Sequence, residues 1–206
     1  MFLFYHIKYF LKTASCDCNI KKKENGVLMD ELNKKSVLIM LDDVVNDFSV
    51  NLAALGVEYN PKSDLVTARN YISIFFKDNG DLSGIGLKAF CETKPDIEGI
   101  DFVNSLYDNG YAVVLCTSRD IRLCYEETKE WLDKNKVKYT YLFTATAPAG
   151  LCIDMDIPVM VYNLPENGEK NINLVGFKIE NGKKLPVEIG VYKTFEEAEK
   201  CITANF

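Results

Sequence analysis

The sequence predicts an α/β fold with a parallel sheet, and three observations lead to this prediction. Six mostly apolar residues, Ser36 to Leu41, stop at Asp42 and Asp43, as a strand buried on both faces does at a sheet edge. A helical pattern and a second apolar run, Tyr111 to Cys116, follow further along the chain. With 206 residues, 48% of them hydrophobic, the chain can bury the core of one domain that carries an insertion.

The net charge of the chain indicates which class of partner it can bind, and its cysteines indicate its cellular compartment. The net charge is -6 and the lysines are scattered, which excludes long nucleic acid as a partner but allows a small phosphorylated molecule. The seven cysteines are odd in number, and apart from Cys16 and Cys18 they lack metal-ligand spacing, so we expect reduced thiols and a cytoplasmic protein. His6 is the single histidine of the chain, which argues against histidine triads and His-rich metal sites.

Two segments lie outside the predicted core of residues 36–206. Residues 1–35 form an accessory segment, whose apolar start, Met1 to Leu11, contains Lys8 and is far shorter than the ~20 residues of a membrane span, so we expect no membrane partner. Residues 57–94 mix helical runs with glycine breaks at Gly80, Gly84 and Gly86. We interpret this second segment as a small inserted helical cap.

The pair Asp42-Asp43 is the first candidate functional feature. It follows a buried strand, and in open α/β sheets ligands bind outside the carboxyl ends of the strands. Two carboxylates at that place can hold a hard cation such as Mg²⁺ or divide acid and base work. The alternative is structural: the pair opens a turn or caps the helix predicted from Val44 to Leu55.

A second candidate feature ends the next strand. The amphipathic helix from Pro95 to Gly110 leads into the strand Tyr111 to Cys116, and Thr117-Ser118-Arg119 follow at once. Two hydroxyls and a guanidinium before a helix can bind the oxygens of a phosphate, although a helix cap would use similar residues. Together with the Asp pair at a neighbouring strand end, they favour the anion site.

The carboxy-terminal part completes the sheet. We expect a strand from Ile157 to Asn163, a hairpin of Leu174 to Ile179 and Leu185 to Val191 across Asn181-Gly182, and a helix, Phe195 to Ile202, capped by Thr194.

These motifs, in this order, resemble the haloacid dehalogenase-like (HAD) phosphohydrolases, and most closely the 5'(3')-deoxyribonucleotidase group. The resemblance is carried by Leu41 to Phe48, Pro95 to Gly99 and Val114 to Arg119, and Leu151 to Asp156 is interpreted as a third apolar strand ending in the acidic metal-binding motif. It implies a doubly wound, Rossmann-like, mostly parallel sheet with a small helical cap, and hydrolysis of phosphate monoesters such as nucleotides. It also implies Mg²⁺ held by Asp42 and Asp154, and phosphate bound by Asp43, Thr117, Ser118 and Arg119.

The chain departs from this family at two catalytic positions. The family's aspartyl nucleophile falls on Met40 and its acid/base on Asp42, and a thioether can neither attack phosphorus as a carboxylate does nor bind Mg²⁺ well. The stretch from Phe143 to Gly150, where the family has a lysine, contains none.

Three hypotheses follow from these observations. The first is a HAD-like protein that binds phosphate or a nucleotide but is catalytically impaired, a pseudo-phosphatase. The second is an active Mg²⁺-dependent phosphohydrolase that uses Asp42 or Asp43, aided by Lys136 or Lys138; it needs a bulge, because a one-residue shift reverses the face of a strand residue. The third is a different doubly wound protein, such as a receiver-like domain. The sequence identifies no protein partner.

Overall fold

The computed structural model describes residues 35–54, 92–117, 121–145, 147–166 and 168–206, all within the compact unit Leu32–Phe206, without the side chains of residues 52 and 121–124. Most of the predicted accessory segment and cap, together with Ser118 and Arg119, lie outside these ranges. In the described part, no helix is both long and apolar enough to span a membrane.

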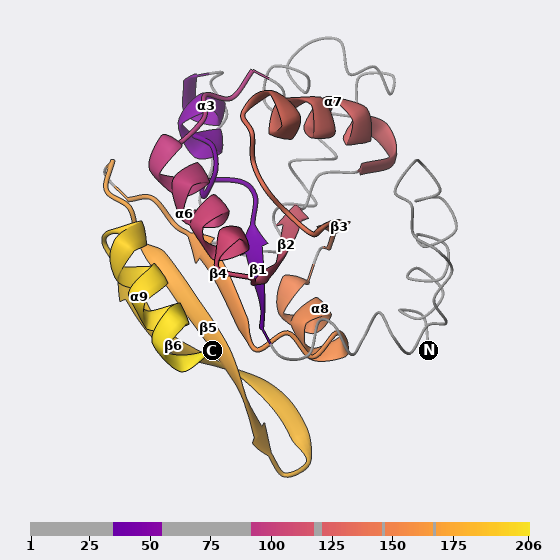
Figure 1. Ribbon diagram of the computed structural model, residues 1–206, viewed down its shortest axis with the longest axis vertical. Helices are drawn as coiled ribbons and strands as arrows, with labels where there is room; N and C mark the ends of the chain where they lie inside the picture. The colour runs from indigo at the N-terminus through magenta and orange to yellow at the C-terminus, as the bar shows by residue number, and fades with distance from the viewer. Residues whose placement is uncertain (1–34, 55–91, 118–120, 146, 167) are drawn as a thin grey trace. The chain divides into compact units, whose positions relative to one another are not determined.

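The described elements form a six-stranded sheet with helices (Figure 1). In chain order they are β1 (Ser36–Met40), α3 (Phe48–Ala54), α6 (Ile97–Asp108), β2 (Ala112–Thr117), α7 (Ile121–Lys134), β3 (Tyr141–Thr144), α8 (Pro148–Asp154), β4 (Val159–Asn163), β5 (Ile172–Glu180), β6 (Lys183–Tyr192) and α9 (Phe195–Asn205). The strand order is β3-β2-β1-β4-β5-β6. The first four of these strands are parallel, whereas β5 and β6 are antiparallel to their neighbours, so the predicted α/β class and mostly parallel sheet are confirmed.

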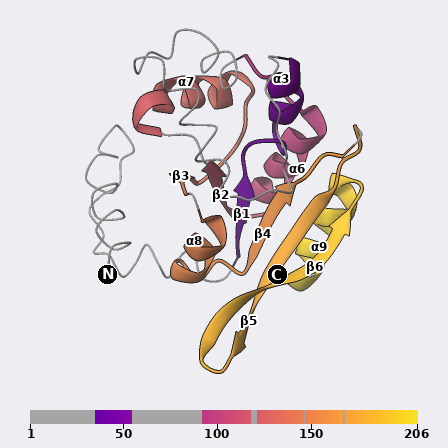
Figure 2. The same ribbon diagram turned by 180° about the vertical axis from the view of Figure 1, so that it is seen from behind.

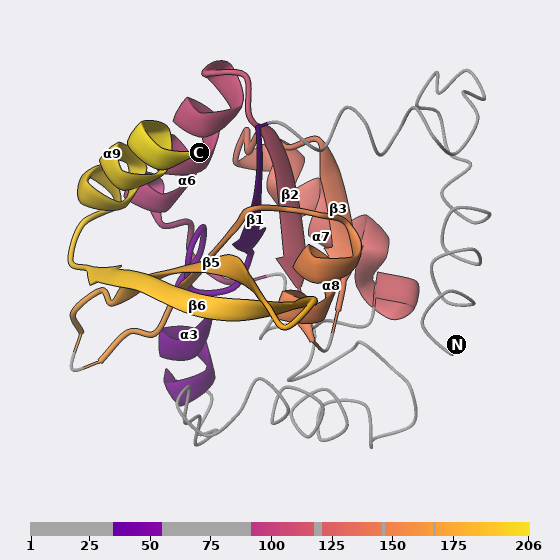
Figure 3. The same ribbon diagram turned by 90° about the horizontal axis from the view of Figure 1, so that it is seen from below.

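The sheet separates two apolar layers. Along β1, Val37 and Ile39 face the layer formed with α6, α7 and α9, and Leu38 and Met40 face the layer formed with α8. Helices α6 and α9 lie side by side, with their phenylalanine rings stacked at 5.2 Å between centroids (Figure 3). Because all five residues of β1 are buried, the strand has the nearly continuous apolar sequence expected in the middle of a parallel sheet.

Several predicted elements are confirmed with small shifts of their ends. Helix α6 begins after Asp96, whose carboxylate accepts a hydrogen bond from Gly99 N, and it stops before Gly110, where φ is 83°. The hairpin turns at Asn181 and Gly182, both with positive φ, as a two-residue turn of type I′ requires.

The outer hairpin continues past the strand beside it (Figure 2). Strand β4 pairs with β5 only from Ile172 to Gly176, so the rest of β5 pairs with β6 alone. Strand β6 is an edge of the sheet, contains Pro186, and shifts register opposite Leu174 and Val175.

Two predictions about secondary structure are wrong. The run Leu151 to Asp156 is not a strand: it belongs largely to helix α8, which starts at Pro148 and buries Leu151 and Cys152. Proline is favourable at the start of a helix, and a short buried apolar run has the same pattern in a helix and in a strand. The helix predicted from Val44 begins only at Phe48, because Asp43 has a left-handed φ of 63° and starts a turn.

Candidate functional site

The structure brings Asp42 and Thr117 together at the carboxyl ends of β1 and β2. Met40 and Cys116 are paired across these two strands, so the residues that follow them leave the sheet at the same edge. Thr117 Oγ1 donates a hydrogen bond to Asp42 Oδ2 at 3.1 Å. These two predicted residues therefore share one site, whereas Ser118 and Arg119, which follow Thr117, lie outside the described residues.

Asp43 turns its carboxylate toward the start of α3. Its Oδ1 accepts a hydrogen bond from Ser49 N at 2.7 Å and its Oδ2 accepts one from the Ser49 hydroxyl, while the residue is only 5% exposed. The pKa of this carboxyl is raised from 3.8 to about 7. Burial is the main cause, the hydrogen bonds from Ser49 oppose the rise, and the charges of Asp42 and Asp47 add to it. Asp43 is thus a buried, easily protonated group that anchors a helix, which agrees with the structural alternative for the Asp pair.

Asn46 organises the turn between β1 and α3. Its Oδ1 accepts hydrogen bonds from Asp43 N at 3.1 Å and Phe48 N at 3.2 Å, and its Nδ2 donates to Asp42 Oδ1 at 3.3 Å. The side chain therefore sets the direction of the Asp42 carboxylate. Sequence reasoning missed Asn46, although an asparagine that follows a strand end is a known signal for side-chain to backbone turns.

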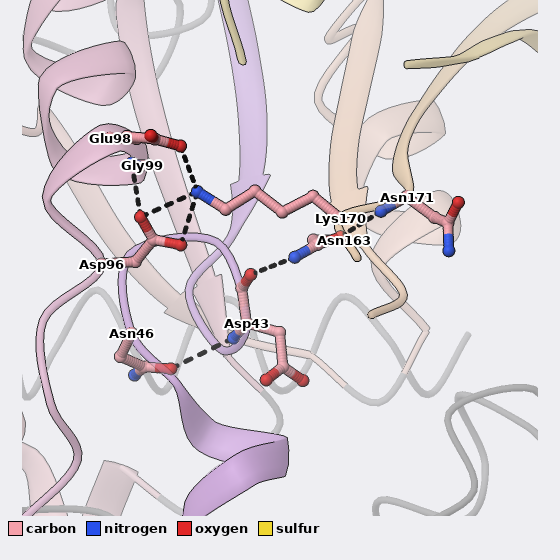
Figure 4. Close-up of polar contacts among 8 residues, drawn as sticks. All are labelled: Asp43, Asn46, Asp96, Glu98, Gly99, Asn163, Lys170 and Asn171. Carbon is pink, nitrogen blue, oxygen red and sulfur yellow. Dashed lines mark hydrogen bonds and ion pairs between the residues drawn. The ribbon is translucent and has the colours of Figure 1, made fainter. Parts of the chain in front are cut away.

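Asn163, the last residue of β4, ties this turn to the neighbouring strand. Its Nδ2 donates to the carbonyl oxygen of Asp43 at 2.7 Å, and its Oδ1 accepts from Asn171 N at 2.9 Å (Figure 4). The residue is 7% exposed, so both bonds are largely shielded from water. Asn163 was expected as part of a strand and not as a site residue.

Lys170 and the start of α6 support the turn from the other side. Lys170 Nζ lies 2.9 Å from Asp96 Oδ2 and 2.6 Å from Glu98 Oε2, and it lowers the pKa of the Glu98 carboxyl (Figure 4). Gly99 allows the helix to approach the turn, because a Cβ at that position would lie 1.7 Å from Val44 O. The lysine charge is therefore already used by two carboxylates.

Met40 lies where the resemblance places the nucleophile, and its side chain is packed. It is 9% exposed in the apolar layer that also holds Leu38, Cys116 and Leu151. Met40 therefore packs as an ordinary core methionine at the position of the nucleophile.

Asp154 does not join Asp42, so the predicted metal pair is wrong. Asp154 is exposed at the end of α8, just before β4, and Val159 at the start of β4 pairs with Val37 near the start of β1. Asp154 therefore lies at the amino-terminal edge of the parallel strands, opposite to Asp42. The error follows from the mistaken strand, because a helix delivers its last residue to the other edge of the sheet.

The lysines suggested for an active enzyme also lie far from Asp42. Lys138 Nζ forms an ion pair with Asp108 at 2.7 Å, and Lys136 offers its carbonyl oxygen to the amide of Asn104. Both lysines precede Thr140, which is hydrogen-bonded to Val113 near the start of β2.

We compared the chain with protein-family models, curated proteins and solved structures. None of them matches. The candidate site is therefore defined by its geometry and by the motif resemblance alone.

The described residues at this edge offer few ligands for Mg²⁺. This cation is usually held by one or two carboxylates, with waters and substrate phosphates as its remaining ligands. Within residues 35–54 and 92–206, leaving out the short gaps, no three His, Cys, Asp or Glu side chains gather at a common point. Asp42 is hydrogen-bonded by Thr117 and Asn46, Asp43 is turned to Ser49, and β4 ends in an amide.

Proposed function

We propose that the chain is a HAD-like protein with a doubly wound sheet that binds phosphate or a nucleotide and is impaired as a phosphatase. The observation that carries this proposal is Met40, an apolar side chain packed at the carboxyl end of β1, two residues before Asp42. In the family that the motifs resemble, a carboxylate at this position attacks phosphorus. A methionine keeps the strand and removes the nucleophile.

The strand order supports a ligand site at this edge. The chain runs from β1 to β2 and β3 on one side and returns to β4 on the other side of β1, and ligands of open α/β sheets bind where the order reverses. The turn after β1 is hydrogen-bonded there to Thr117, the last residue of β2, and to Asn163, the last residue of β4. The hydroxyl of Thr117, followed in sequence by Ser118 and Arg119, supplies the residue types that bind phosphate oxygens.

The alternative, an active Mg²⁺-dependent phosphohydrolase, needs Asp42 or Asp43 as nucleophile. The Asp43 carboxylate accepts two hydrogen bonds from Ser49, so its attack would break the start of α3. Asp42 is oriented by Thr117 and Asn46, and Lys138 is paired at the opposite edge of the sheet. The geometry therefore favours binding over hydrolysis.

A phosphate-release assay separates these two functions. We expect the purified protein with Mg²⁺ to release no phosphate above background from an aryl phosphate or from deoxynucleoside monophosphates. Met40→Asp restores the missing carboxylate, so we expect this variant to release phosphate faster than the wild-type protein. Release by the wild-type protein that disappears in Asp42→Asn would contradict the proposal and support the active alternative.

A thermal-shift titration tests the binding half of the proposal. A ligand that binds only the folded state adds ~2.7 kcal/mol of stability at 100 times its dissociation constant. We expect inorganic phosphate or a deoxynucleoside monophosphate to raise the melting temperature, and Thr117→Val to reduce the rise. If none of these ligands shifts the transition, the site does not bind phosphate and the proposed function is wrong.

The free thiols are compatible with the cytoplasmic location that we propose. Among the described cysteines, Cys116 and Cys152 are buried and unpaired, as expected for a protein kept in a reducing compartment.

A further inference from the structure

The residue at the end of β4 indicates whether the candidate site needs a divalent cation. Strand β4 runs parallel to β1 and leaves the sheet at the same edge, so its last residue is well placed to complete a site around Asp42. That residue is Asn163. We propose that the site binds its phosphate ligand without a divalent cation, because Asn163 acts as a tether for the Asp42-Asp43 turn in place of a metal ligand. This inference rests on the proposed function.

Both polar ends of Asn163 are already used within the protein. The amide nitrogen donates to Asp43 O at 2.7 Å, and the amide oxygen accepts from Asn171 N at 2.9 Å. An asparagine can bind a hard cation only through its oxygen, which here points to the backbone of the β4–β5 connection (Figure 4). A cation at this oxygen would compete with a buried hydrogen bond for the same acceptor.

The tether and a carboxylate ligand exclude each other at this position. An aspartate at residue 163 has no N–H to give to Asp43 O, and it would place an acceptor 2.7 Å from another acceptor. The main chain of Asp43 is held in a left-handed conformation, with φ of 63°, and the bond from Asn163 helps to fix it. The fold thus uses this position to shape the turn that presents Asp42.

The nearby cation cannot take over the role of a metal ion. Lys170 Nζ contacts Asp96 and Glu98 (Figure 4). The same ammonium lies 4.6 Å from the centre of the Phe195 ring. It stabilises the start of α6 through these two carboxylates.

Titrations of the wild-type protein test the inference directly. We expect Mg²⁺ alone to leave the melting temperature unchanged, and the affinity for inorganic phosphate to agree within about twofold in millimolar Mg²⁺ and in EDTA. Phosphate binding that is lost in EDTA, or a Mg²⁺-induced shift that disappears in Asp42→Asn, would overturn it. No phosphate binding under either condition would refute the proposed function instead, and the titration with Mg²⁺ alone would still report on metal binding.

A matched pair of variants tests the role of Asn163. Asn173 is also 7% exposed and also donates one amide hydrogen bond, to Asn171 O at 2.6 Å, but it does not contact Asp43. We expect Asn163→Asp to weaken phosphate binding in EDTA by about tenfold or more, as for the loss of one strong hydrogen bond, and Asn173→Asp to leave it nearly unchanged. Equal effects of the two substitutions would show that Asn163 has no special role in the site.

Adding carboxylates gives a second readout that does not depend on activity. Met40→Asp combined with Asn163→Asp supplies acidic groups at the ends of β1 and β4, and we expect this double variant to gain a Mg²⁺-dependent thermal shift. Met40→Asp combined with Asn173→Asp is the control and should gain none. A Mg²⁺-dependent thermal shift of the same size in both double variants would show that residue 163 does not contribute to the binding of the cation.

Discussion

Replacing Asp43 by asparagine should abolish most of the pH dependence of stability between pH 5 and pH 8. The carboxyl is 5% exposed, and its pKa is raised mainly by burial from 3.8 to about 7. The folded state therefore holds a proton that the unfolded chain has already released in this range. Stability is highest below the unfolded pKa and falls as the pH rises through the folded pKa.

The size of the effect follows from the two pKa values. Each pKa unit corresponds to ~1.36 kcal/mol, so with pKa values of 3.8 and about 7 the wild-type protein should lose about 2.5 kcal/mol between pH 5 and pH 8. Asparagine keeps the acceptor for Ser49 N and tolerates the left-handed φ of 63°, so Asp43→Asn should still fold. Its stability should change little over the same range.

Urea unfolding at several pH values provides the measurement. The chain has one tryptophan, Trp131, which is 7% exposed, so its fluorescence reports the loss of the core. Asp108→Asn is a suitable control, because this exposed carboxylate is paired with Lys138 at the opposite edge of the sheet, and it should keep the wild-type slope. If Asp43→Asn kept that slope as well, or if wild-type stability rose with pH, the assignment of the buried proton to Asp43 would be refuted.

Two further substitutions test the support of the turn. Gly99→Ala should destabilise the protein by about 1–3 kcal/mol in urea unfolding, because its Cβ would collide with Val44 O. Gly150→Ala in α8, where a Cβ would lie 3.9 Å from Ala147 Cβ, should be neutral or stabilising. Equal effects would contradict the close approach of α6. Lys170→Met should lower the free energy of unfolding by about 1–3 kcal/mol, because Asp96 and Glu98 lose their partner. Lys200→Met breaks an exposed pair with Glu196 and should hardly change the urea midpoint of unfolding. Similar urea midpoints for the two variants would show that Lys170 contributes no more than a surface lysine.

The strands beside the candidate site were predictable because their sequences are unambiguous. Ser36 to Met40 and Val113 to Cys116 are short, mostly apolar runs followed closely by polar residues, the pattern typical of strands buried in a parallel sheet. Helix α6 carries its start and stop signals, Asp96 and Asn109-Gly110, in the sequence. In each case a local pattern determines the element.

The remaining parts of the site depend on contacts that no local pattern encodes. Leu151 and Cys152 are apolar in a strand or in a helix, and only packing against β1 and β2 decides for the helix. The partners of Asn163 are Asp43, 120 residues earlier in the chain, and Asn171 in the following connection. The same holds for Lys170, whose carboxylate partners are more than 70 residues away.

The outer hairpin has a consequence for the solution behaviour of the protein. A ten-residue edge strand exposes main-chain groups to which a strand of another molecule can add, the usual start of sheet-based aggregation. In β6, Pro186 removes one main-chain donor, Lys183 and Lys184 bring charge near the tip, and the register shift near Leu174 interrupts the regular spacing. The exposed edge is thus a poor template for strand addition, although Ile179 and Val191 remain 79% and 48% exposed on the same hairpin.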